Sequence, residues 1–211
     1  PGRPLIGVAL RRWFHKRGGF VPHRIRTAMG INRGEGQAAL QDLIDQVAAA
    51  VRGLARELDA AVLLLPSYNV GHEADDQVAR QLQSALAGTE NHLVVLDDPA
   101  RYKAVTGMLS LLVSARMHPL IFAAGMGVPI VGLGYNAKFA GLFSQLGVQP
   151  RLIDLDDFAI EPQTERLGNL MRAAIGAPGD LRAAADALAS RARIDVVAAL
   201  HPDAAAAEGM P

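Results

Sequence analysis

The stretch Leu-Leu-Val-Ser-Ala-Arg-Met-His-Pro-Leu-Ile-Phe-Ala-Ala-Gly-Met-Gly-Val-Pro-Ile-Val-Gly-Leu, residues 111–133, decides the fold. Residues 111–113 are a short apolar run that predicts a buried strand, and residues 129–133 predict another. Residues 118–126 lie between the two and are typical of a buried helix. Two parallel strands need a crossover connection of this kind, and such crossovers are right-handed. The stretch therefore predicts an α/β protein built on a parallel sheet.

The same alternation of strand and helix continues on both sides of this unit. Because the alternation is strict, it predicts a doubly wound, Rossmann-like sheet. We expect a single domain over residues 1–200 and a disordered tail over residues 201–211. Further strands are predicted at residues 5–10, 61–65, 93–96 and 152–153. Further helices are predicted at residues 40–58, 74–86, from 99 onward, at 138–146, and at 164–200 with a break near 176–179.

Composition excludes several classes of function. The 211 residues carry a formal net charge of zero, which gives no sign of a nucleic-acid partner. The chain has no cysteine, so disulfides, thiolate zinc sites and a cysteine nucleophile are excluded. Residues 119–137 are uncharged over about the length of a membrane span, but glycines and Pro129 interrupt them. We therefore expect no transmembrane segment.

Arg116 and His118 are the most informative residues of the chain. They are the only residues between 104 and 137 that can carry a positive charge, and this stretch contains no acid. Ligands of such folds bind outside the carboxyl ends of the strands, and a helix N-terminus adds N–H donors there. The pattern predicts an anion-binding site. The alternative is that an acid from a neighbouring loop pairs with Arg116, while His118 is satisfied in the core.

A cationic loop follows the first predicted strand. Its arginines and lysines all precede the first acid, Glu35. Guanidinium groups bind phosphate and carboxylate in bidentate fashion, so Arg11 and Arg12 at the strand end are candidate anion-binding residues. For the cations farther along the loop, residues 16–26, we favour a solvated surface.

The other strand ends carry weaker candidates. Asp97 is a candidate binding residue, whereas Asp98 before Pro99 has the pattern of a helix N-cap. Tyr135 and Lys138 follow the fifth strand and could reach a bound ligand. The acids in residues 72–76 lack the spacing of a metal site, and we interpret them as first-turn acids that favour a helix dipole.

A dinucleotide-binding pattern offers a different reading of the fifth strand end. Gly132-Leu133-Gly134-Tyr135-Asn136-Ala137 fits G-x-G-x-x-A, and Asp154 falls near the position of a ribose-binding acid. This match supports a nicotinamide-dependent oxidoreductase as an alternative. Against it, the pattern follows the fifth strand instead of opening the sheet, and the helix after it is short.

Three segments together resemble the polysaccharide pyruvyl transferase family. Residues 113–123 are similar to its serine-x-arginine-x-histidine turn and the helix after it. Residues 127–138 resemble its G-V-P strand with the following Y-x-x-K, and residues 6–13 resemble the strand, arginine and tryptophan that open its second half. Order and spacing agree over roughly residues 5–150.

The resemblance implies the second half of a two-domain, glycosyltransferase-B-like fold. It also implies transfer of pyruvate from phosphoenolpyruvate, with no further cofactor, to a sugar or lipid-linked saccharide as a ketal. The product is a cell-surface polysaccharide precursor, which implies a cytoplasmic protein at the inner face of the membrane. The chain begins without Met, and the family's N-terminal domain is absent from it, so we expect this chain alone to be inactive.

The resemblance also implies roles for the candidate residues. We expect His118 to be the general acid, because a histidine exchanges a proton near neutral pH. Arg116 and Arg11 are expected to clamp the donor's anionic groups, and Asp97 to contact or deprotonate an acceptor hydroxyl. A non-catalytic anion- or sugar-binding domain with the same fold remains a further alternative. The remaining residues expected to contact substrate are Arg12, Ser114, Tyr135 and Lys138.

Overall fold

The computed structural model describes residues 2–12, 33–68 and 75–200. Most of the cationic loop and the tail expected to be disordered lie outside the described residues. The short apolar runs form one six-stranded sheet with the order β3-β2-β1-β4-β5-β6, and every neighbouring pair is parallel. The strands are β1 (Leu5–Ala9), β2 (Ala61–Leu64), β3 (Asn91–Leu93), β4 (Leu111–Ser114), β5 (Ile130–Gly134) and β6 (Leu152–Asp154).

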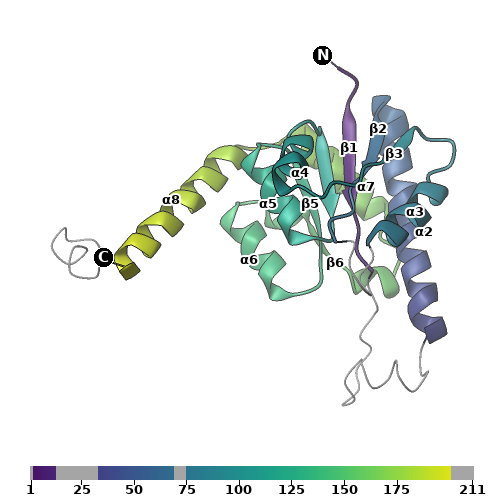
Figure 1. Cartoon of the computed structure of the whole chain (residues 1–211). Helices are drawn as coiled ribbons and strands as arrows, with labels where there is room; N and C mark the ends of the chain where they lie inside the picture. The colour runs from purple at the N-terminus through teal and green to yellow at the C-terminus, as the bar shows by residue number, and fades with distance from the viewer. Residues whose placement is uncertain (1, 13–32, 69–74, 201–211) are drawn as a thin grey trace.

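Helices cover both faces of the sheet (Figure 1). On one face lie α2 (Arg33–Leu58), α3 (Asp75–Ala85) and α7 (Thr164–Gly176). On the other lie α4 (Pro99–Thr106), α5 (Met117–Gly125), α6 (Ala137–Gln145) and the beginning of α8 (Leu181–Leu200), whose remainder runs away from the sheet (Figure 1). Two short 3-10 helices, η1 (Gln149–Arg151) and η2 (Asp157–Ala159), flank β6.

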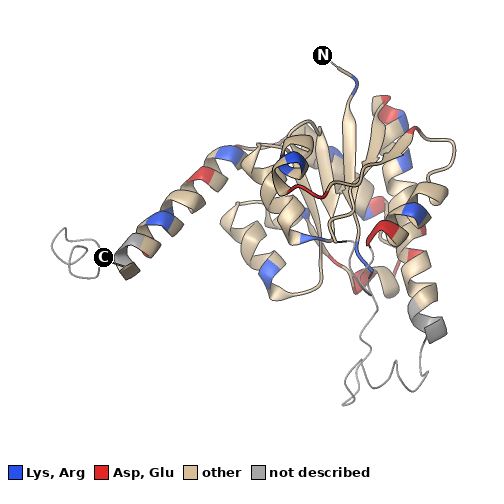
Figure 2. Cartoon of the chain, viewed as in Figure 1, with Lys and Arg blue, Asp and Glu red and all other residues tan. Residues whose placement is uncertain are grey.

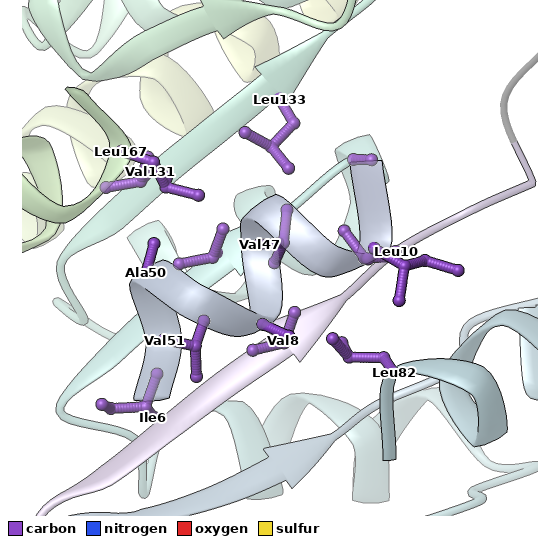
Figure 3. Packing of buried hydrophobic residues seen from close by; sticks show 14 of the residues in the cluster. Ile6, Val8, Leu10, Val47, Ala50, Val51, Leu82, Val131, Leu133 and Leu167 are labelled. Atoms are coloured by element: carbon purple, nitrogen blue, oxygen red, sulfur yellow. The ribbon is translucent and has the colours of Figure 1, made fainter. Parts of the chain in front are cut away.

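Side chains that alternate along the strands build the core between the sheet and α2. Ile6 and Val8 of β1 are buried against Val47 and Val51 of α2 (Figure 3). A parallel sheet that is covered on both faces needs such continuous apolar strands. Charged residues therefore lie mainly on the helices and in the connections, while the strands are almost free of charge (Figure 2).

The strand order determines where a ligand site is expected. The chain order reverses between β1 and β4, which are neighbours in the centre of the sheet. In an open parallel sheet this topological switch point leaves a crevice outside the carboxyl ends of the strands. The carboxyl ends of β1 and β4 lead to Arg11 and Arg116, the two arginines that the sequence singled out.

The predicted α/β fold with its doubly wound parallel sheet is confirmed. The prediction was wrong about the position of one strand. The prediction put the third strand at residues 93–96, whereas β3 is Asn91–Leu93. The prediction followed the apolar residues 93–96. Because β2 ends at Leu64, residues beyond Val94 have no strand to pair with. The helix predicted at residues 40–58, α2, begins earlier, at Arg33. Within the described residues, none of the helices has the length and apolar character needed to cross a membrane.

Candidate functional site

The turn between β4 and α5 is held by the hydroxyl of Ser114. This side chain is fully buried, and its Oγ accepts a hydrogen bond from the Arg116 backbone N–H at 2.9 Å. Its single proton is within reach of two carbonyl oxygens, of Arg116 at 2.9 Å and of Ala9 at 3.2 Å. Ser114 therefore ties the turn to β1 and fixes the backbone from which Arg116 projects. Direct contact between Ser114 and a substrate stays a prediction.

Arg116 forms a bidentate ion pair with Asp75, the first residue of α3. Arg116 Nε donates to Asp75 Oδ2 at 2.9 Å, and Nη2 donates to Oδ1 at 2.6 Å. The Asp75 side chain is 0% exposed and that of Arg116 is 14% exposed. Because β1 lies between β4 and β2 in the sheet, this pair spans the carboxyl end of β1. The acid partner that the sequence left as an alternative is thus present: Asp75 lies in the first turn of α3, as predicted, and also pairs with Arg116.

Two further contacts from Tyr68 surround this ion pair. The Tyr68 backbone N–H donates to Asp75 Oδ2 at 3.1 Å, and the Tyr68 ring centroid lies 5.7 Å from Arg116 Cζ. Burial raises the pKa of Asp75 above its usual range, and the hydrogen bonds and charge of Arg116 act against that rise.

A cleft of about 330 Å³ opens beside Arg116 at this edge of the sheet. The exposed ring of His118, in the first turn of α5, lies on its wall. His118 is therefore not a satisfied core histidine, which was the second part of the alternative. Asp97, in the connection after β3, lines the same cleft, so three of the predicted site residues meet here.

Aromatic side chains that were not among the candidate site residues form much of the remaining wall. Tyr68, Tyr102 and Phe122 all line the cleft. The Tyr102 hydroxyl donates to the Leu65 carbonyl at 2.9 Å and lies 2.9 Å from Ser67 Oγ. Burial raises the pKa of Tyr102, so the phenol remains protonated and serves as a fixed wall. The spacing of these residues in the sequence gave no signal, because they come from three separate segments.

Arg11 and Tyr135 form a second group at the same edge. Arg11 Nη1 donates to the Tyr135 hydroxyl at 2.5 Å, and Arg11 Cζ lies 4.5 Å from the centre of the Tyr135 ring. Since β4 lies between β1 and β5, this contact spans the carboxyl end of β4. Lys138 is exposed in the first turn of α6, after the N-cap Asn136. The structure therefore places cationic residues on both sides of the β4–α5 turn.

Arg12 lies in different surroundings from the other candidates. It lines a smaller hollow of about 230 Å³ together with residues of α2 and α3, among them Gln77 and Gln81. The cations of residues 13–32 lie outside the described residues, so their predicted roles stay predictions. Within the described residues, no group of three or more His, Asp or Glu side chains is arranged to hold a metal ion.

Packing accounts for the glycines of the dinucleotide-like pattern. Gly132 is inside β5, and a Cβ there would lie 2.5 Å from Phe143 Cζ. A Cβ on Gly134 would lie 3.1 Å from Phe139 Cβ. Both glycines make room for the phenylalanines of α6, whereas a dinucleotide fingerprint needs its glycines in the loop that faces the pyrophosphate. The glycines are thus explained without a nucleotide.

A comparison with protein families supports one of these readings. The family model for polysaccharide pyruvyl transferase matches residues 6–137, which is more than half of the chain. The chain belongs to the polysaccharide pyruvyl transferase family. The match runs from Ile6 in β1 past the end of β5 and so includes Arg11, Arg116, His118 and Tyr135.

A solved structure of another protein shares the fold. The S. aureus MnaA–UDP co-structure matches with a TM-score of 0.53 at 12% identity, covering 87% of this chain and 40% of that one. A putative UDP-N-acetylglucosamine 2-epimerase from Listeria monocytogenes matches with a TM-score of 0.42 at 20% identity, covering 88% and 43%. This chain thus has a glycosyltransferase-B-like α/β fold and spans less than half the length of the S. aureus structure.

Proposed function

We propose that this chain provides the donor-binding site of an enzyme that transfers pyruvate from phosphoenolpyruvate to hydroxyls of a polysaccharide precursor as a ketal. The proposal rests on one observation: Arg116 and an exposed His118 line the same cleft at the switch point of the sheet. Membership in the polysaccharide pyruvyl transferase family supports pyruvyl transfer in general. The donor, the ketal product and the roles of the residues are our inference.

The charge distribution of the site suits a donor with two anionic groups. Phosphoenolpyruvate carries a carboxylate and a phosphate, and guanidinium groups bind both. Arg116 lines the cleft on one side of the β4–α5 turn, and Arg11 is held by Tyr135 on the other side. The N–H groups at the start of α5 add partial positive charge between them. In this scheme Arg116 and Arg11 hold the two anionic groups, and Lys138 adds an exposed cation nearby.

His118 is placed to act as the general acid. In the proposed reaction it gives a proton to the methylene carbon of phosphoenolpyruvate, and the neighbouring carbon becomes cation-like. A first sugar hydroxyl adds to that carbon and gives up its proton, which restores the histidine. A second hydroxyl then adds while the carbon–oxygen bond to phosphate breaks, and phosphate leaves with the second proton. One donor and two hydroxyls give one ketal and one inorganic phosphate.

Asp97 is the candidate residue for binding the acceptor. Asp97 lines the same cleft as Arg116 and carries the opposite charge. A carboxylate accepts hydrogen bonds from sugar hydroxyls. We propose that Asp97 contacts or deprotonates the acceptor hydroxyl. We also propose that a second Rossmann-like half completes the cleft and binds the rest of the saccharide acceptor. The shorter length of this chain relative to the structures it resembles supports that view.

The test of the catalytic assignment is the variant His118→Ala in the enzyme with its second half present. Turnover at saturating donor and acceptor should fall by roughly 10²- to 10⁴-fold, because general acid catalysis contributes about that factor. His92→Ala is the matched control, since His92 is exposed on the edge strand β3, away from the cleft. If His118→Ala turned over substrate at nearly the wild-type rate, the general-acid assignment would be wrong.

Calorimetry separates this proposal from its alternatives. Phosphoenolpyruvate should bind to the chain, and NAD should not. Binding of NAD alone would favour the oxidoreductase. Binding of phosphoenolpyruvate with no turnover, even with the second half and an acceptor present, would favour a non-catalytic anion-binding domain.

A further inference from the structure

Among the described residues, Asp75 is the one Asp, Glu, Lys, Arg or His side chain that is buried. Removing a carboxylate from water is costly unless the charge is paired and hydrogen-bonded. An acid that only favoured the dipole of α3 could do so from an exposed position. Asp76, the next residue of the same helix end, is partly exposed and fills that role. The burial of Asp75 therefore needs another explanation.

Stability is a weak explanation for the Asp75–Arg116 pair. Buried ion pairs are often no more stabilising than apolar residues of similar volume, because desolvation offsets the attraction between the charges. What such a pair provides is fixed geometry. Two parallel N–H···O bonds, at 2.9 Å and 2.6 Å, define both the position and the plane of the Arg116 guanidinium.

The carboxylate of Asp75 is itself held in place. The Tyr68 N–H donates to Asp75 Oδ2 at 3.1 Å, and the Asp75 N–H donates to the Tyr68 carbonyl at 2.9 Å. The Tyr68 ring lies over the guanidinium at 5.7 Å. Arg116 is thus fixed along one edge by Asp75, from one face by Tyr68 and at its backbone by Ser114. The connection after β2 and the turn after β4 contribute together to one cationic wall of the cleft.

We propose that Asp75 is a positioning residue that orients the Arg116 guanidinium for the anionic donor. This inference rests on the proposed function, because it takes Arg116 as a donor-binding group. It predicts that the donor affinity depends on a residue that does not line the cleft. A misplacement of about 1 Å in a binding group can cost up to about 100-fold in activity.

The test compares the dissociation constant for phosphoenolpyruvate of the whole chain in four forms, measured by calorimetry at one salt concentration. Arg116→Gln should weaken binding, which tests the proposed function independently. Asp75→Asn should weaken binding roughly 10- to 100-fold. The double variant should bind no more weakly than Arg116→Gln alone, because Asp75 acts only through Arg116. Asp76→Asn is the matched control and should bind like the wild type.

Each other result contradicts a specific part of the inference. If Asp75→Asn lowered the melting temperature but bound phosphoenolpyruvate like the wild type, Asp75 would have a purely structural role. If Asp75→Asn bound more tightly, Asp75 would compete with the donor for Arg116 instead of orienting it. If Arg116→Gln bound like the wild type, the proposed donor site would fail, whatever Asp75 did.

A measurement on the wild-type protein covers the case in which Asp75→Asn does not fold. The Arg116 Nε–H signal, assigned in ¹⁵N NMR by its loss in Arg116→Gln, should exchange slowly with water because Asp75 holds it. Saturation with phosphoenolpyruvate should leave that hydrogen bond in place. Fast exchange in the presence of the donor would show that the pair opens on binding and would overturn the positioning role.

Discussion

Replacing Ser114 with alanine removes the hydroxyl that closes the β4–α5 turn. This buried hydroxyl accepts one hydrogen bond, from the Arg116 N–H at 2.9 Å, and donates one to a backbone carbonyl. Each such bond contributes a net of about 1 kcal/mol, so the free energy of unfolding should fall by about 2 kcal/mol. For a chain of this size that corresponds to a melting temperature lower by roughly 4–8 °C. Urea unfolding and thermal unfolding measure the two quantities.

The same substitution should lower the affinity for phosphoenolpyruvate, because the turn sets the position of Arg116. We expect the dissociation constant for phosphoenolpyruvate to rise roughly tenfold, as for a binding group that is displaced by part of an ångström. Ser110→Ala is the matched control: its Oγ accepts the Leu5 N–H at 3.3 Å at the opposite end of β4. It should cost less stability and leave donor binding unchanged. The reasoning would be refuted if Ser114→Ala had the wild-type free energy of unfolding and the wild-type affinity for phosphoenolpyruvate.

Two more predictions concern packing and charge. Gly132→Ala should lower the free energy of unfolding by about 1–3 kcal/mol, because its Cβ would lie 2.5 Å from Phe143 Cζ. Gly53→Ala is the control, because nothing lies within 4 Å of a Cβ there. It should raise the free energy of unfolding, measured in the same urea experiment. The pKa of Asp75, followed by ¹³C NMR of its carboxyl, should lie above its usual range and should rise further in Arg116→Gln, because Arg116 acts to lower it. Since the folded state then holds this proton more tightly than the unfolded chain, the contribution of Asp75 to stability is fully present below about pH 3.9 and falls as the pH rises through the folded pKa. An Asp75 pKa below the usual range, or unchanged in Arg116→Gln, would contradict this account.

The fold follows largely from local patterns in the sequence. Apolar runs and helical spacing place nearly all strands and helices, because a sheet covered on both faces leaves a continuous apolar signal in each strand. The exception is β3, an edge strand with the polar residues Asn91 and His92, whose position depends on the length of its neighbour β2. The position of the site at the strand ends follows from the fold class alone.

The contacts within the site could not be predicted in the same way. Asp75 lies far from Arg116 in the sequence, and the two meet only because β2, β1 and β4 are neighbours in that order. The pairing of Arg11 with Tyr135 depends equally on β4 lying between β1 and β5. The alternation of strands and helices predicts a parallel sheet but not its strand order. One signal was available: a buried arginine in a stretch with no acid needs a carboxylate or a bound anion from elsewhere.

The central claim is that Arg116 binds the anionic donor, and calorimetric titration of phosphoenolpyruvate tests it most directly. The variant Arg116→Gln should bind at least about tenfold more weakly than the wild type, since a charged hydrogen bond contributes about 1.5–3 kcal/mol. Arg56→Gln is the control, because Arg56 is exposed in the last turn of α2 and does not line the cleft. It should bind like the wild type. Equal affinity of Arg116→Gln and wild type for phosphoenolpyruvate would contradict the account.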